Sequence, residues 1–126
     1  MTSPIIIAAS LLLFPALTFL GQAPAKKIKV RLTHYGYPGD PHASNNTRLG
    51  LGDRNNILNP DSVAISPDLD HIFPFGSKVV VDGQFIGYRH DTTRPKLKRT
   101  IAVYDPQGQF KDGDADVYIQ VPANTK

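Results

Sequence analysis

The stretch KVVVDGQFIGYRH, residues 78–90, decides the fold that we expect for this chain. Three consecutive valines lead into Asp82-Gly83, and residues 84–90 follow with a second run of β-forming side chains. An Asp-Gly pair between two such runs is a strong signal for a two-residue hairpin turn. The stretch therefore predicts two antiparallel strands joined tightly at residues 82–83.

Short β-type runs continue on both sides of this hairpin, and turn-forming Gly, Pro, Asn and Asp separate them. Residues 27–33 alternate polar and apolar side chains, which is typical of a half-buried strand. Further strands are expected at 63–65, 100–104 and 115–121. Because no long helical periodicity interrupts them, the sequence predicts an all-β fold of about six short strands with long loops and little helix.

Two segments between these strands are expected to form a loop and a helical turn. Residues 36–61 are rich in Gly, Pro, Asn and Asp and are expected to form one long loop. A loop of that length in a compact domain is usually functional or mobile. Residues 66–70 are expected to make a helical turn, with Ser66 as N-cap and Pro67 at the first helical position.

The first 25 residues carry no charged side chain, and residues 5–20 are almost entirely apolar. A small-x-small pattern, Ala23-Pro24-Ala25, then precedes two lysines. This order predicts a secretory signal peptide at 1–25, an exported domain at 26–121 and a tail at 122–126. The alternative is an uncleaved membrane anchor, although the apolar run is shorter than the ~20 residues that a spanning helix needs.

The composition narrows the class of partner. Lys and Arg number 14 against 11 Asp and Glu, giving a formal charge of +3. An excess this mild fits a polymer with scattered negative charge, such as a cell wall, and does not indicate nucleic acid. The chain has no cysteine, which excludes a lipoprotein anchor and thiol chemistry and favours a bacterial origin. The four histidines show no metal-ligand spacing, so a zinc site is not expected. We also expect no cofactor, and a monomer.

Three pieces of sequence, taken in order, resemble a known family. They are the strand end Leu32-Thr33-His34-Tyr35, the step from residues 63–69 through 73–79, and Gly87-Tyr88-Arg89-His90-Asp91-Thr92 followed by the run 100–104. This order is similar to the three-aspartate (3D) domain, a small double-psi β-barrel. That domain occurs in membrane-bound lytic transglycosylase A and is related to the barrels of rare lipoprotein A and expansins. The resemblance spans residues 28–118.

The resemblance implies a six-stranded double-psi β-barrel with a groove for peptidoglycan or a related polysaccharide. In such an enzyme an aspartic acid protonates the glycosidic oxygen, and the sugar's own 6-hydroxyl then attacks the anomeric carbon. One carboxyl group can serve both steps, whereas the usual hydrolases need two carboxyl groups ~5–9.5 Å apart. The expected setting is the bacterial periplasm or the extracellular cell wall.

The chain departs from the family at two of its three aspartates. Ser66 stands where the family often has an aspartate, and Ala102 stands where the resemblance places the acid. Asp91 remains. A second register would move Asp116 into the acid position if the loop were longer by fourteen residues. The first register needs no insertion in the loop, whereas the second keeps an acid at the position where the resemblance expects one. The loss at residue 102 also leaves open a glycan-binding module without catalysis.

The resemblance and these departures give the candidate site residues. The catalytic candidates are Asp91 and Asp116, and the substrate-binding candidates are Thr33, Tyr35, Arg89, Thr92 and Arg94. The alternative for Asp91 is a turn-capping carboxylate paired with Arg89 or Arg94. Such cations would lower its pKa and oppose a role as general acid, unless they point away.

The remaining charged residues fit plainer roles. Asp105 precedes a proline and is expected in a turn, and Asp112 and Asp114 in a solvated polar turn. Arg94, Lys96 and Lys98 alternate, so on a strand they would share one face, either binding an anionic polymer or blocking aggregation of a sheet edge. The rings of His34, Tyr37 and His42 are candidates for a groove wall.

Overall fold

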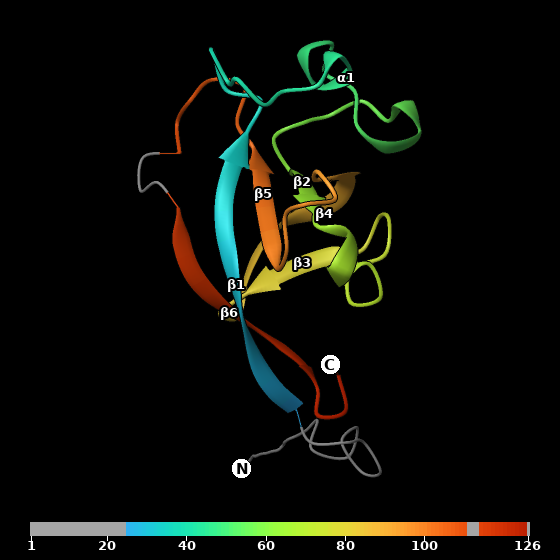
Figure 1. Cartoon of the computed structure of the whole chain (residues 1–126), viewed down its shortest axis with the longest axis vertical. Helices are drawn as coiled ribbons and strands as arrows, with labels where there is room; N and C mark the ends of the chain where they lie inside the picture. The colour runs from blue at the N-terminus through green and yellow to red at the C-terminus, as the bar shows by residue number, and fades with distance from the viewer. Residues whose placement is uncertain (1–24, 111–113, 126) are drawn as a thin grey trace, which may run out of the picture. The chain divides into compact units, whose positions relative to one another are not determined.

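A computed structural model describes residues 25–110 and 114–125 of the chain, and strands dominate this part (Figure 1). The predicted signal peptide lies outside the described residues except for Ala25. Within those residues, no helix combines the length and the apolar character needed to cross a membrane. Residues 27–121 form one compact unit.

Six strands make a single sheet, which is curled like half of a barrel. They are β1 (Ala25–Tyr35), β2 (Ser62–Ile65), β3 (Lys78–Val81), β4 (Gln84–Thr92), β5 (Thr100–Tyr104) and β6 (Ala115–Pro122). Their order across the sheet is β3-β4-β2-β5-β1-β6. The prediction of an all-β fold with six short strands, long loops and little helix is confirmed.

The predicted hairpin is present between β3 and β4. Val81 pairs with Gln84, and both turn residues have positive φ, 49° at Asp82 and 78° at Gly83. Positive φ at both central residues matches the right-handed twist of the flanking strands. Val79 and Val81 are buried, and Val80 between them is exposed. The hairpin therefore buries one face of β3, as a period of two requires.

Parallel and antiparallel pairs are mixed in this sheet. β1 pairs parallel to β5, β2 pairs parallel to β4, and β2 pairs antiparallel to β5. The edge strands of the sheet also approach one another, because the N–H of Asp82 donates to the carbonyl oxygen of Tyr118 at 2.9 Å. This hydrogen bond ties the β3–β4 turn to β6 and holds the curl.

The core is apolar, aliphatic except for Phe73, and lies within the curl of the sheet. Its buried members are Ile28, Val30, Val63, Ile65, Leu69, Phe73, Val79, Val81, Ile101, Ile119 and Val121. Burying a side chain of this size contributes roughly 1.5–3 kcal/mol relative to leaving it exposed. Every strand contributes to this set except β4, whose Ile86 packs against it. The sheet is thus held by its side chains, in a chain without cysteine.

The segment expected to be one long loop contains structure of its own. The short helix α1 (Asn45–Arg48) begins at Ser44, whose hydroxyl accepts from the N–H of Thr47 at 3.1 Å. A 3₁₀ turn, η2 (Asp53–Asn55), follows. In Figure 1, α1 lies beyond the arrowheads of β1 and β5. The loop is therefore folded by local caps and covers that end of the two strands.

The helical turn after Ser66 forms, but Ser66 does not cap it with its side chain. The 3₁₀ turn η3 (Pro67–Leu69) starts at the predicted proline. The Ser66 hydroxyl instead accepts from the backbone N–H of Thr100 at 2.9 Å, and the residue is fully buried. Ser66 thus occupies the predicted N-cap position, while its hydroxyl joins the end of β2 to the start of β5.

Candidate groove above the alanine row

One row of side chains crosses four adjacent strands at the centre of the sheet. Asp91 of β4 is in register with Ala64 of β2, Ala64 with Ala102 of β5, and Ala102 with Thr33 of β1. Residues in register on neighbouring strands lie on the same face of a sheet. The two alanines in the middle are small and buried, so the row is low in its centre and higher at both ends.

A groove of ≈ 620 Å³ lies over this row. It brings together five of the predicted site residues, namely Thr33, Tyr35, Asp91, Thr92 and Arg94. Ala64 and Ala102 line it as well. Two predicted site residues, Arg89 and Asp116, are not among those that line it. The position at which the resemblance places the acid is therefore part of the groove, but its side chain is a methyl group.

Asp91 lies at one end of the row with a half-buried carboxylate. It accepts hydrogen bonds from the hydroxyl of Tyr35 at 3.0 Å and from the N–H of Thr92 at 2.9 Å. Within residues 25–110 and 114–125, no cation lies close enough to form an ion pair with it. Burial raises the pKa of Asp91 above its ordinary value, and the two hydrogen bonds offset this only in part. Burial and the nearby Asp91 also raise the pKa of Tyr35.

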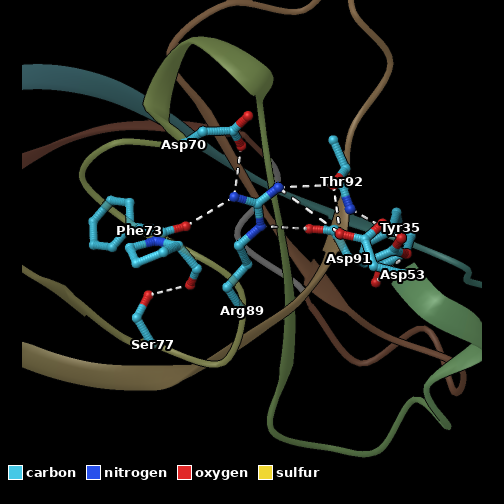
Figure 2. A network of polar contacts seen from close by, with 9 residues as sticks. Tyr35, Asp53, Asp70, Phe73, Ser77, Arg89, Asp91 and Thr92 are labelled. Carbon is cyan, nitrogen blue, oxygen red and sulfur yellow. Dashed lines mark hydrogen bonds and ion pairs between the residues drawn. The ribbon is translucent and has the colours of Figure 1, made fainter.

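Arg89 does not pair with the carboxylate of Asp91, contrary to the alternative drawn from the sequence. Figure 2 shows its guanidinium directed at Asp70 (2.6 Å), at the carbonyl oxygen of Phe73 (2.8 Å) and at the hydroxyl of Thr92 (2.8 Å). Its Nε donates to the backbone carbonyl of Asp91 at 3.2 Å. Arg89 is only 6% exposed. It holds the backbone that carries Asp91 without forming an ion pair with the carboxylate, and its charge only partly offsets the effect of burial on the pKa of Asp91.

Thr92 connects this buried arginine to a second carboxylate. Its hydroxyl accepts from Arg89 and donates to Asp53 at 2.6 Å. The negative charge of Asp53 also raises the pKa of Asp91. No local sequence pattern singles out Asp53, which lies in the η2 turn. The preceding Gly52 packs closely against β4, because a Cβ there would lie 2.4 Å from the carbonyl oxygen of His90.

The other end of the row carries a carboxylate that the sequence analysis missed. The hydroxyl of Thr33 donates to Asp114, and the guanidinium of Arg31 forms an ion pair with the same carboxylate. Arg31, Thr33 and Asp114 all line the groove. Asp114 is exposed, as expected for a polar turn, but it is not merely solvated because Arg31 and Thr33 bind its carboxylate. Asp112 lies outside the described residues. No local pattern could have linked residue 114 to residue 33.

Asp116 and Asp105 are placed away from Asp91 and its row. Asp116 faces Lys29 at 3.9 Å, and both side chains are well exposed. Asp105 is buried in the turn that its Asp-Pro context predicts, where it accepts from His34 (2.8 Å) and from the N–H groups of Gln109 and Phe110. Burial opposes ionisation, but these hydrogen bonds lower the pKa of Asp105 below its ordinary value. His34 stacks between Tyr37 and Phe110.

The basic segment that follows Asp91 is a loop, so its alternating cations do not share a strand face. Arg94 and Lys96 line the groove, whereas Lys98 does not. The guanidinium of Arg94 reaches the carbonyl oxygen of His42 at 3.5 Å. Arg94 and Lys96 thus bring positive charge to the rim of the groove near Asp91.

No protein-family model, curated protein or solved structure matches this chain. Across residues 25–110 and 114–125, no three His, Cys, Asp or Glu side chains are grouped so that they could hold a metal ion. The chemistry of the groove must therefore be argued from its own side chains.

Proposed function

We propose that this chain is an exported bacterial protein that acts on cell-wall glycan, with peptidoglycan bound in the groove above Ala64 and Ala102. Its activity is lytic-transglycosylase-like cleavage, with Asp91 as general acid and then general base. The observation that carries the proposal is the carboxylate of Asp91, which lines the groove, is half-buried and has a raised pKa. A general acid must hold its proton near the working pH, and these surroundings favour that.

In this reaction Asp91 donates its proton to the glycosidic oxygen as the bond from that oxygen to the anomeric carbon breaks. The 6-hydroxyl of the same sugar then attacks the anomeric carbon, and the Asp91 carboxylate takes the hydroxyl proton. The product is a 1,6-anhydro sugar, and the acid is regenerated without water. The hydroxyl of Tyr35 and the N–H of Thr92 would hold Asp91 in place through both steps.

The remaining features of the proposal come from the sequence. The ordered motifs around Asp91 resemble the three-aspartate domain, so the curled sheet would be a double-psi barrel. The apolar N-terminal segment would direct export. We propose that the protein acts as a monomer without a cofactor and does not bind nucleic acid.

The test is product analysis. The purified protein is incubated with peptidoglycan sacculi, and the soluble products are examined by mass spectrometry for 1,6-anhydro muropeptides. We expect such products from the natural protein and from Asp116→Asn, and none from Asp91→Asn. If the natural protein forms none while a known lytic transglycosylase does so under the same conditions, the enzymatic proposal fails.

A second candidate function is glycan binding without cleavage. The observation that favours it is Ala102, because this position lies on the groove floor between the two ends of the row and carries no acid. In that case the natural protein is retained on sacculi without cleaving them, and Ala102→Asp stays inactive while retention remains strong. If the protein neither cleaves nor binds sacculi, both functions fail.

A further inference from the structure

The groove has two polar ends, and the proposed reaction uses only one of them. Asp91 stands at the β4 end of the row, where the hydroxyl of Tyr35 reaches it from the end of β1, and Arg31, Thr33 and Asp114 stand at the β1 end. Both sets line the same groove. A ligand that lies across the alanine floor would therefore meet a carboxylate on each side.

The position of Asp114 relates it to the missing acid at residue 102. Thr33 is in register with Ala102 on the adjacent strand, and neighbouring strands lie ~4.8 Å apart. Asp114 is bound to the Thr33 hydroxyl, so its carboxylate is displaced from the side of Ala102 by roughly one strand spacing. The chain thus has an acidic side chain beside the place where the resemblance expects one, although it comes from a different part of the sequence.

Asp114 differs from an ordinary surface carboxylate in what surrounds it. Asp116, on the same segment, faces Lys29 and lies outside the groove lining. Asp114 is held by Arg31 and Thr33, both of which line the groove. A carboxylate has about four lone-pair sites, so two donors leave capacity for further hydrogen bonds. Hydroxyl groups of a sugar are donors of the required kind.

We propose that Asp114 is the second ligand-contacting carboxylate of the groove, and that it supplies from the β1 side the acidic group that residue 102 lacks. Arg31 and Thr33 are its positioning residues. The ligand class is a glycan whose hydroxyl groups donate to Asp114 while a neighbouring glycosidic bond lies near Asp91. This inference rests on the proposed function and adds to it a second contact point across the floor.

The experiment measures retention of the full chain on peptidoglycan sacculi, in pull-downs over a range of sacculus concentrations. Asp114→Asn keeps the size of the side chain and removes its charge, and Asp116→Asn is the matched control. We expect Asp114→Asn to weaken binding about tenfold, which corresponds to losing one good polar contact. Asp116→Asn is expected to bind like the natural protein.

A rescue variant separates a ligand contact from a merely structural role. Adding Ala102→Asp to Asp114→Asn returns a carboxylate to the groove floor without restoring the contacts to Arg31 and Thr33. We expect this double variant to recover most of the lost binding. Thr33→Val, which removes the orienting hydroxyl from a β-branched side chain, should weaken binding in the same direction but less. Thermal unfolding of each variant confirms that the protein is folded.

The outcomes separate this inference from the proposed function. If the natural protein binds sacculi and Asp114→Asn binds equally well, the inference fails and the proposed function stands. Equal losses in Asp114→Asn and Asp116→Asn would show a general charge effect and would also overturn it. Failure of the double variant to recover binding would contradict the relation to residue 102. If the natural protein does not bind at all, the proposed function fails, and the inference fails with it.

Discussion

The hydroxyl of Tyr35 donates a hydrogen bond to the carboxylate of Asp91 across 3.0 Å, and so joins the end of β1 to β4. These strands are not neighbours in the sheet, because β2 and β5 lie between them. The bond therefore spans the groove beside the alanine row. It also stabilises the ionised form of Asp91 and works against burial, which favours the protonated form.

Replacing Tyr35 with Phe removes this donor and keeps the ring. We expect the pKa of Asp91 to rise further, because one of the two hydrogen bonds that oppose burial is lost. Since the proposed acid must be protonated, the pH at which activity declines should move upward. The check is the rate of anhydro-muropeptide release across the acid to neutral range.

Tyr104→Phe is the control for this change. Its ring lies 5.6 Å from that of Tyr35, and its side chain is not part of the groove lining. The pH dependence should stay as in the natural protein. A Tyr35→Phe profile that coincides with the natural one would show that the bond does not tune Asp91.

Asp91 and Asp105 should affect stability in opposite directions as pH changes. The folded pKa of Asp91 is raised above its ordinary value of 3.8, so in the window above 3.8 the folded state binds more protons and stability falls as pH rises. The folded pKa of Asp105 is lowered, so its contribution is present above 3.8 and is lost as pH falls through the folded pKa. Asp91→Asn should therefore gain relative stability as the pH rises, and Asp105→Asn should lose it.

Denaturant unfolding of the natural protein and the two variants, at acidic and at neutral pH, measures both trends. The comparison is internal, because each variant replaces a carboxylate with an amide of the same size. Parallel trends in the two variants would contradict the assignment of opposite pKa shifts.

Arg89 should be needed for folding more than for ligand contact. Its guanidinium is bonded to Asp70, Thr92 and two backbone carbonyls, and breaking a buried ion pair from one side typically costs about 3–5 kcal/mol. We expect Arg89→Met to lower the free energy of unfolding on this scale. The loss should fall toward the lower end, because Asp70 is partly exposed and water can solvate its carboxylate. Arg94→Met, at an exposed position, should change stability by less than about 0.5 kcal/mol. Equal effects at the two arginines would contradict the buried network.

Gly87 should tolerate no side chain. Its φ is +153°, and a Cβ there would lie 2.4 Å from the carbonyl oxygen of Asp61 and 2.8 Å from Val63. Gly87→Ala must displace β2 from β4, and overpacking of this kind costs about 1–3 kcal/mol or more. Gly83→Ala is the control, because nothing lies within 4 Å of its Cβ and only its positive φ adds roughly 1–2 kcal/mol. Thermal unfolding should rank the two variants in that order.

Local patterns were enough to predict the strands. The Asp-Gly turn fixed the hairpin, and the run at 100–104 coincides with β5 (Thr100–Tyr104). The predicted strand at 27–33 lies within β1 (Ala25–Tyr35). The order of the strands in the sheet and the short helix α1 were not accessible in this way. The strand order depends on contacts between distant segments. The helix depends on a cap at Ser44, which does not stand out among the many polar residues of its loop.

The site was predicted in part. The sequence singled out Asp91 and Tyr35, and they prove to be bonded to each other. The expected lowering of the pKa of Asp91 by neighbouring cations is present for Arg89, but burial outweighs it and the pKa is raised. Arg89 alternates with His90 on β4 and turns its charge toward Asp70. Asp114 was missed because its partner Thr33 lies 81 residues away in the sequence.

The parallel pairing of β1 with β5 determines the stage of folding at which the groove forms. Arg31 is in register with Thr100, so the β1 and β5 parts of the groove come from distant parts of the chain. Contacts between residues so far apart form slowly, because the entropy of closing the intervening loop must be overcome first. A chain emerging from a secretion channel with residue 31 first would have no groove until β5 had followed. In the exported protein that we propose, the groove would therefore be completed late, after β5 had left the channel.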